Sequence, residues 1–412
     1  MLLIYRFLIN LLIFFLPFVG LYRILQGKEN LNSLTQKFGF YTKNNKNKLI
    51  WFHGSSVGEI LSVMPLIQEL EKNKKINQIL ITSNTLSSSK IISKIKFKKT
   101  IHQFYPIDHI FFSNKFLNYW KPNIAIFLES EIWPSMFRSI KNKNIPLILL
   151  NARITKKTYN RWFKIKKFSN SIFSLIDKAY SQNSETNYYL KKLNVKSIKS
   201  IGNLKFIEND NFESNQADKK LFSQFKRYKT FIAASTHDTE ELFAAKTHIL
   251  LKKKNKNIIT IIIPRHVNRV NQIISQINEL GLNVISRSSN KRKLKNIDIF
   301  VVDTFGESKK FYKFATTVFL GGSIIKRGGQ NPLEAARFGT KILHGPNIDN
   351  FKDVYKYLNQ LKISSKVNSP QECANSIIFR KNMKKAKKMK YLGTTILKKT
   401  LNELDKSIHN EI

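Results

Sequence analysis

Cysteine is nearly absent from this sequence, and the motifs of several common enzyme classes are missing. A single cysteine, Cys373, among 412 residues excludes an internal disulfide framework and a cysteine-rich metal site. The eight histidines show no zinc-ligand spacing, and there is no GxxxxGK(S/T) loop and no GxGxxG run after the first expected strand. The sequence therefore lacks the signatures of kinases, NTPases and dehydrogenases. The single cysteine suits a reducing compartment, so the body of the chain is expected in the cytoplasm.

Acidic residues are also scarce, with 27 Asp and Glu against 71 Lys and Arg, for a net charge of +44. A field of this sign attracts nucleic acid, anionic lipid or phosphorylated substrates. The basic residues are mostly lysine and are scattered rather than interleaved with aromatics in one stripe, and a general richness in Lys, Asn and Ile explains part of the excess. The charge predicts an anionic partner, and the pattern weighs against nucleic acid.

The N-terminal segment is apolar, with the sequence MLLIYRFLINLLIFFLPFVGLYRIL. No small-residue cleavage site follows it, so residues 1–26 are interpreted as an uncleaved membrane anchor. The uninterrupted part, Phe7–Leu21, is shorter than the roughly 20 residues of a full span, so it either spans with snorkelling ends or lies in the interface. The lysine-rich remainder is then expected on the cytoplasmic side. The alternative is a buried helix packed on its own domain.

Apolar runs alternate with helical segments along the rest of the chain. Hydrophobic residues make up 42% of the sequence, enough for the two domains that its length suggests. Continuous apolar runs of this kind belong to parallel sheets covered on both faces. The expected strands are KLIWFHGS, QILITS, HQFYPI, NIAIFLE, PLILLNA and AYSQN, and, after the polar segment 208–220, TFIAAS, IITIIIPR, IDIFVVDT, TVFLGG and KILHGP.

This alternation predicts an α/β fold of two Rossmann-like domains facing a cleft. The predicted domains are residues 27–207 and 221–385, joined by a linker at 208–220 and followed by a C-terminal helix at 386–412. Ligands are expected beyond the carboxyl ends of the strands.

Glycine is clustered, since six of the fifteen glycines fall in residues 319–351. A strand is expected to end at Gly321–Gly322, and a helix to begin with Asn331 as its cap and Pro332 at its first position. Paired glycines and a helix N-terminus favour a bound phosphate. Glu334 either accepts hydrogen bonds from ribose hydroxyls or only complements the helix dipole.

Further candidate residues follow other expected strands. Arg265 and His266 come after one strand, where arginine offers a planar fork to phosphate, and DTFGE at 303–307 follows another. Glu59 begins a helix after the first strand, so it is either a general base or a helix cap.

Two more groups of charged residues end strands or precede the linker. Glu129 and Glu131 lie where the chain turns after a strand, and Lys205 lies just before the linker, near the expected cleft. The alternative for these residues is ordinary loop charge.

Many of these segments together resemble one enzyme family. The segments SSVGE, YPID, ESEIWP, NARIT, GNLKF, ASTHDTEE, PRH, DTFGE, FLGGS, GGQNPLEAA and GPNIDNFKD occur in the order seen in the 3-deoxy-D-manno-oct-2-ulosonic acid (Kdo) transferases of lipopolysaccharide synthesis. The resemblance runs from the anchor to about Val354.

The resemblance implies a GT-B glycosyltransferase anchored at the cytoplasmic face of the bacterial inner membrane, in contact with its anionic lipids. It implies CMP-Kdo as donor, lipid IVA as acceptor, and an inverting transfer that needs no metal or other cofactor. Glu59 would be the proton acceptor, and Glu129 and Lys205 would stabilise the transition state. The residues that would bind CMP are Pro264, Arg265, Phe305, Gly306, Glu307, Asn331, Pro332, Leu333 and Glu334.

The sequence departs from the family pattern at two of these segments. Phe305 stands where the family usually has Met, and Gln330 where it commonly has His before the Asn-Pro-Leu-Glu run, which puts any role of that histidine in doubt. Two competing functions stay open from the sequence. One is another GT-B transferase acting on a lipid-linked acceptor, and the other is a membrane-tethered basic protein that binds nucleic acid.

Overall fold

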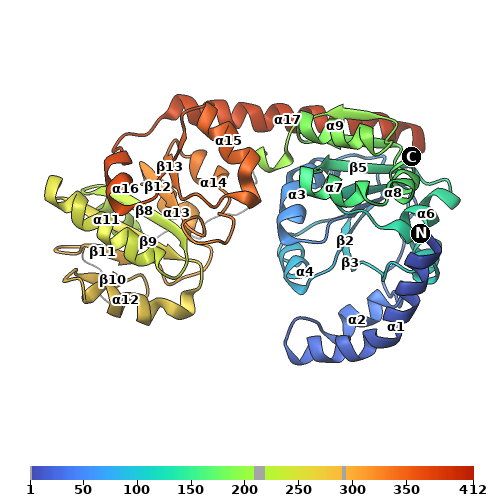
Figure 1. Ribbon diagram of the computed structural model, residues 1–412, viewed down its shortest axis with the longest axis horizontal. Helices are drawn as coiled ribbons and strands as arrows, with labels where there is room; N and C mark the ends of the chain where they lie inside the picture. The colour runs from blue at the N-terminus through green and yellow to red at the C-terminus, as the bar shows by residue number, and fades with distance from the viewer. Residues whose placement is uncertain (1, 208–218, 290–293) are drawn as a thin grey trace. The chain divides into compact units, whose positions relative to one another are not determined.

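The computed structural model describes residues 2–207, 219–289 and 294–412. The chain divides into two compact units, each drawn in Figure 1. Unit 1 comprises residues 1–209 and 393–412, and unit 2 comprises residues 210–392. Most of the predicted linker, residues 208–218, lies outside the described residues, and the domain boundaries given above stay predictions.

Unit 1 contains a seven-stranded sheet in the order β3-β2-β1-β4-β5-β6-β7, and every pair of neighbouring strands is parallel. All six strands expected in this half of the chain are confirmed. The strands are β1 (Leu49–His53), β2 (Gln78–Ser83), β3 (Thr100–Phe104), β4 (Ile124–Leu128), β5 (Leu147–Ala152), β6 (Lys178–Ser181) and the unexpected β7 (Ile198–Ser200).

Helices lie on both faces of this sheet (Figure 1), which is why its central strands are continuous apolar runs. Trp51 and Phe127, on neighbouring strands, are fully buried in the core and contact each other edge to face. The helices are α2 (Leu31–Lys37), α3 (Val57–Leu70), α4 (Leu86–Ser93), α5 (Ile110–Trp120), α6 (Pro134–Asn142), α7 (Lys156–Phe163), α8 (Lys166–Phe173), α9 (Ser184–Lys192) and the short η1 (Leu204–Phe206).

The apolar N-terminal segment forms one 24-residue helix, α1 (Leu2–Leu25). It lies beside α2 (Figure 1), and the contact is close because Gly20 faces Leu34. Within the described part of the chain, no helix has both the length and the apolarity needed to cross a membrane. Many large apolar side chains of α1 are nevertheless exposed, and they are Phe7, Leu11, Leu12, Phe14, Phe15, Phe18, Val19, Leu21, Tyr22 and Leu25.

Unit 2 contains a second seven-stranded parallel sheet, in the order β10-β11-β9-β8-β12-β13-β14. The five strands expected here are confirmed, and β10 and β14 are additional short edge strands. The strands are β8 (Lys229–Thr236), β9 (Ile258–Pro264), β10 (Val284–Ser286), β11 (Ile299–Val301), β12 (Thr317–Leu320), β13 (Lys341–His344) and β14 (Ser364–Lys366).

The helices of unit 2 also cover both faces of their sheet (Figure 1). The helix predicted to have Asn331 as its cap begins one residue later, because Pro332 is its N-cap, and only Leu333–Ala336 are helical. The helices are α10 (Lys219–Phe225), α11 (Glu240–Lys254), η2 (Val267–Arg269), α12 (Val270–Asn278), α13 (Ser308–Tyr312), α14 (Leu333–Ala336), η3 (Asp349–Phe351), α15 (Lys352–Gln360) and α16 (Pro370–Ser376).

The last helix, α17 (Met383–Glu411), begins in unit 2 and ends in unit 1. In unit 1 its Leu404 and Ile408 are buried. Gly393 marks the start of this portion and lies against backbone, since a Cβ there would be 2.5 Å from the carbonyl oxygen of Phe206. A glycine is therefore required for the helix to approach this chain segment.

We predict that Gly393→Ala destabilises unit 1, although alanine normally favours a helix over glycine by about 1 kcal/mol. Overpacking against a backbone oxygen costs about 1–3 kcal/mol, so the melting temperature should fall by several degrees. Thermal unfolding followed by circular dichroism measures the effect. Gly58→Ala in α3 is the control, because the nearest atom to a Cβ there is 3.9 Å away, and equal melting temperatures for the two variants would contradict the prediction.

Candidate active site

The polar residues of unit 1 gather at the edge where its parallel strands end. The strand order reverses between β1 and β4, and ligands of open α/β sheets bind at such a switch point. The helix after β1, α3, carries Glu59 in its first turn, and the loop after β4 carries Glu129 and Glu131. The sheet therefore brings three carboxylates to one place.

Glu59 is the third residue of α3, and its carboxylate closes the start of this helix. Its Oε2 accepts hydrogen bonds from the backbone N–H of Ser55 at 2.7 Å and of Ser56 at 3.3 Å. The Ser56 hydroxyl in turn accepts the backbone N–H of Glu59, so the two residues form a capping box. The capping interpretation of Glu59 is confirmed, and it leaves the carboxyl group held in a fixed position beside the switch point.

The environment of Glu59 raises the pKa of its carboxyl group from 4.5 to about 7. Burial is the largest cause, followed by the negative charges of Glu131 and then Glu129, and the bonds from Ser56 oppose them. A carboxyl group that titrates near neutral pH is suited to taking up a proton during a reaction.

Glu131 is bound on several sides by residues that the sequence reasoning did not assign. Its Oε2 accepts hydrogen bonds from the Ser55 hydroxyl and from Trp133 Nε1 at 2.9 Å, and His53 Nε2 lies 3.4 Å away. Burial raises the pKa of Glu131, but the nearby His53 ring and the hydrogen bonds from Ser55 and Trp133 outweigh burial and hold this pKa below its usual range. Glu131 is therefore a stable anion.

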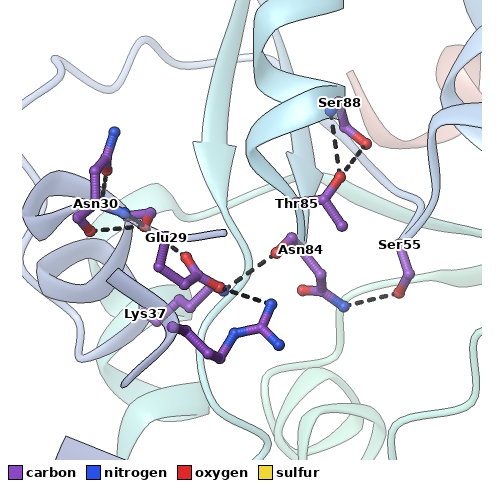
Figure 2. A network of polar contacts seen from close by, with 9 residues as sticks. Glu29, Asn30, Lys37, Ser55, Asn84, Thr85 and Ser88 are labelled. Carbon is purple, nitrogen blue, oxygen red and sulfur yellow. Dashed lines mark hydrogen bonds and ion pairs between the residues drawn. The ribbon is translucent and has the colours of Figure 1, made fainter. Parts of the chain in front are cut away.

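The Ser55 hydroxyl is also bound by a second side chain, that of Asn84. Asn84, which follows β2, donates from its amide to the Ser55 hydroxyl at 2.8 Å. Lys37 Nζ donates to the carbonyl oxygen of Asn84 at 3.1 Å and pairs with Glu29 at 2.5 Å. Figure 2 shows this polar network, which ties α2 to Ser55 in the loop before α3.

Glu129 and Lys205, the other two predicted catalytic residues, form an ion pair. The distance from Lys205 Nζ to Glu129 Oε1 is 2.6 Å, and both side chains are largely buried. Glu129 has a φ of +51°, an uncommon conformation for a residue other than glycine. Its backbone is held in this conformation by bonds to Leu150 and Arg153 of the neighbouring chain segment.

A second amide network positions Lys205. The Asn151 side chain, at the end of β5, accepts the backbone N–H of Leu204 at 3.0 Å. Gln182, at the end of β6, accepts from the Asn203 amide, and Asn203 Oδ1 accepts the backbone N–H of Lys205 at 2.9 Å. Two strand ends therefore fix the turn that presents the lysine, and the sequence reasoning missed both amides.

In unit 2, the predicted donor residues also lie at the carboxyl ends of strands. Arg265 follows β9 and donates its backbone N–H to Thr236, the last residue of β8, at 2.9 Å. The two are next to the switch point of this sheet, between β8 and β12.

His237 lies among several cationic side chains at this edge. Burial is the largest cause that lowers the pKa of His237, and the nearby His266, Arg327 and Arg265 lower it further. Its Nε2 is buried and has no hydrogen-bond partner among the described residues. The arrangement concentrates positive charge and one unused polar group where an anionic ligand is expected.

Two further predicted donor segments approach each other. Glu307 accepts from the Thr304 hydroxyl and from Lys310 Nζ at 2.7 Å, and these bonds, against burial, lower the pKa of its carboxyl group. Lys309, on the same segment, lies 3.7 Å from Glu334.

The Phe305 side chain is exposed, at 79%. It is followed by Gly306, with φ +80°, in a turn conformation that glycine adopts readily. In the other segment, Asn331 Oδ1 accepts the backbone N–H of Leu333 at 3.0 Å, and Pro332 separates the two residues. Whether these segments bind CMP stays a prediction.

The loop after β12, which begins with the glycine pair, already binds a carboxylate, the side chain of Glu240. This fully buried carboxylate accepts the backbone N–H groups of Gly322, Ser323 and Ile324 at 2.6–3.0 Å, and that of His237 at 3.0 Å. These three loop amides are therefore not available to a phosphate, and the expectation from sequence was wrong for them. The only sequence signal at Glu240 is its place at the start of the helix after β8, which an exposed carboxylate would share.

Across residues 2–207, 219–289 and 294–412, no group of three or more His, Cys, Asp or Glu is placed to hold an ion.

Two parallel α/β sheets with polar groups at their switch points define a GT-B-like protein. Among solved structures, the chain resembles the UDP-GlcNAc 2-epimerase of Neisseria meningitidis bound to UDP-GlcNAc. The TM-score is 0.58 at 13% identity, covering 87% of this chain and 99% of the other, which shows the fold alone.

Sequence comparison then identifies the family. A family model described as 3-Deoxy-D-manno-octulosonic-acid transferase (kdotransferase) matches residues 32–208. The 3-deoxy-D-manno-octulosonic acid transferase of Rickettsia bellii is 33% identical over 87% of this chain and 85% of its own. The 3-deoxy-D-manno-octulosonic acid transferase of Haemophilus influenzae is 28% identical, and the match covers 86% of this chain and 84% of that protein. The chain belongs to the Kdo transferase family, so the predicted resemblance is confirmed and the protein is a glycosyltransferase.

We predict that Glu240→Gln loosens the loop after β12. The amide retains one acceptor oxygen but turns an NH₂ group toward backbone N–H donors, and leaving buried donors unpaired costs about 1–3 kcal/mol each. Hydrogen exchange of peptides covering residues 320–326 should become faster than in the wild type. Glu279→Gln, at an exposed position just after α12, is the control, and unchanged protection in the Glu240 variant would contradict the prediction.

A second prediction concerns stability and pH. In the folded chain the carboxyl group of Glu59 has a pKa of about 7, whereas in the unfolded chain its pKa is the ordinary value of 4.5. Between these two pH values the folded chain therefore binds more protons than the unfolded chain. The contribution of Glu59 to stability therefore declines as pH rises through this window. Because glutamine does not titrate, the melting temperature of Glu59→Gln relative to wild type should rise from pH 5 to pH 8. Glu69→Gln, on the same helix, is the control, and a flat difference for Glu59→Gln would refute the pKa assignment.

Proposed function

We propose that this protein transfers Kdo from CMP-Kdo to lipid IVA, a lipid A precursor, with inversion and without a metal or other cofactor. The observation that carries the proposal is the placement of Glu59 at the switch point of unit 1. Its carboxyl group has a pKa of about 7 and is fixed by the Ser55 and Ser56 amides. Such a group can accept the proton of a sugar hydroxyl at neutral pH.

The reaction would proceed as a single displacement. The acceptor hydroxyl oxygen forms a bond to the anomeric carbon of Kdo while the bond from that carbon to the CMP phosphate oxygen breaks. The hydroxyl proton passes to Glu59, and the electron pair leaves with CMP. The anomeric carbon acquires oxocarbenium character, as in glycoside hydrolysis.

The buried pair of Glu129 and Lys205 would stabilise this charge separation. Carboxylate charge favours an oxocarbenium-like centre, whereas an ammonium group favours the negative charge on the departing phosphate. The 2.6 Å pair is already desolvated, so little reorganisation is needed during the reaction.

Unit 2 would bind the donor. The cationic residues near the end of β9, including Arg265, support the binding of an anionic nucleotide. The segments Phe305–Glu307 and Asn331–Glu334 are proposed to hold CMP, as the family resemblance implies. The family often has histidine at the position of Gln330, whose amide lies close to Gly322.

The protein is proposed to act at the cytoplasmic face of the inner membrane. The support is the exposed apolar surface of α1, together with the net charge of +44. An amphipathic or apolar helix can lie in the interface and be assisted by attraction to anionic lipids. Contact with the membrane would bring the enzyme to its lipid acceptor.

A transfer assay with CMP-Kdo and lipid IVA tests this function. We predict product from the wild type and a loss of about 10²–10⁴-fold in kcat for Glu59→Gln, the usual contribution of a general base. Glu69→Gln, elsewhere on α3, should retain wild-type activity. Absence of product from folded wild type would overturn the substrates, and full activity of Glu59→Gln would overturn the assignment of the base.

A further inference from the structure

Glu131 has no role in the mechanism above, yet it is the most heavily supported carboxylate of the site. Three side chains from β1, the following loop and the loop after β4 converge on its Oε2, and these are His53, Ser55 and Trp133. Ordinary loop charge does not require this degree of support, so the arrangement calls for a function.

The tautomer of His53 follows from its partners. Trp51 Nε1 donates to Thr82 Oγ1 at 2.8 Å, and an indole can only donate. The Thr82 hydroxyl hydrogen is then directed to His53 Nδ1, at 2.9 Å, rather than to the Phe52 carbonyl, at 3.3 Å. Burial is the main cause that lowers the pKa of His53, so the ring is neutral and carries its hydrogen on Nε2, facing Glu131.

The support makes Glu131 a fixed negative charge rather than a titrating group. The Trp133 indole and the Ser55 hydroxyl donate to Glu131, and the His53 ring beside it is immobilised by stacking on Tyr105 with ring centroids 3.8 Å apart. The site therefore has a carboxylate that stays ionised beside Glu59, which takes up protons near neutral pH.

Glu131 acts on Glu59 by two routes. The first is geometric, because the Ser55 hydroxyl is bound between Glu131 and Asn84 while the Ser55 N–H donates to Glu59 (Figure 2 shows Asn84 and Ser55). The second is electrostatic, through the charge of Glu131. Glu129 also faces Glu59, but Lys205 neutralises it at 2.6 Å, so Glu131 is the larger uncompensated charge.

We propose that Glu131 is a positioning residue, which fixes the Ser55 loop around Glu59 and strengthens Glu59 as a base through its permanent charge. This inference rests on the proposed function of Glu59 as the proton acceptor. In this arrangement Glu59 exchanges a proton during the reaction, whereas the neighbouring Glu131 stays ionised.

The charge and the shape of Glu131 can be tested separately. In Glu131→Gln the shape is kept and the charge is lost, so the acidic limb of kcat/KM against pH should move down by about one unit. The plateau should fall by up to about tenfold, because a weaker base takes the proton less readily. In Glu131→Asp the charge is kept, so the limb should stay at the wild-type pH while the plateau falls.

Ser55→Ala isolates the geometric route. It removes the hydroxyl link but leaves the Glu131 charge, so the plateau should fall without a downward shift of the limb. Glu69→Gln is the matched control for a carboxylate replaced by an amide. The plateau of its kcat/KM and the pH of its acidic limb should both equal those of the wild type. A purely structural role for Glu131 predicts equal losses in the Gln and Asp variants with an unmoved limb, and this result would overturn the proposal.

A readout without substrate separates this inference from the proposed function. The carboxyl carbon of Glu59 can be titrated by NMR in full-length protein labelled with ¹³C at the glutamate side-chain carboxyl, and assigned by difference from Glu59→Gln. The midpoint should be lower in Glu131→Gln than in wild type and Glu131→Asp. An unmoved midpoint refutes the role of Glu131 even if transfer occurs, whereas a lowered midpoint without any Kdo transfer refutes only the proposed reaction. If Glu131→Gln fails to fold, the proposal is decided by Glu131→Asp, which must keep the wild-type midpoint.

Discussion

Backbone N–H groups binding carboxylates are the interaction on which both candidate sites depend. Glu240 accepts hydrogen bonds from four backbone N–H groups at the switch point of unit 2. Glu59 accepts two such bonds at the switch point of unit 1. Asp108 does the same for the start of α6, where it accepts from Ser135 and Met136. A buried carboxylate is costly unless its oxygens are hydrogen-bonded, so each one fixes the loop that supplies its donors. The scarce acidic residues of this basic chain thereby set the shape of its functional edges.

The sheet architecture was open to prediction because its physical cause is visible in the sequence. Strands buried on both faces must be continuously apolar, and runs such as IITIIIPR fulfil this requirement. The missed strands β7, β10 and β14 each have only three residues and lie at or near sheet edges, where polar residues are tolerated. Their patterns, such as SSK, do not differ from those of loops.

The site was predictable where chemistry follows a strand end, and not where partners are distant in sequence. Glu59, Glu129 and Arg265 could be named as candidates because each comes within a few residues of the end of an apolar run. The support for Glu131 could not be found in this way, since His53, Thr82 and Trp133 come from three different strands or loops. Glu240 was missed because a buried carboxylate and an exposed helix-start carboxylate look identical in a sequence, and only the fold determines which anion the glycine loop receives.

The path of α17 also has a consequence for how the protein is made. Residues 393–412 belong to unit 1, where Tyr180 and Lys199 of its last strands contact Glu403. These residues leave the ribosome only after the whole of unit 2 has been synthesised. Domains generally fold as units and in the order of synthesis, but here the earlier unit cannot be complete before the later one has emerged. The surface of unit 1 that buries Leu404 and Ile408 therefore stays uncovered until the end of translation, and unit 2 has the opportunity to fold first.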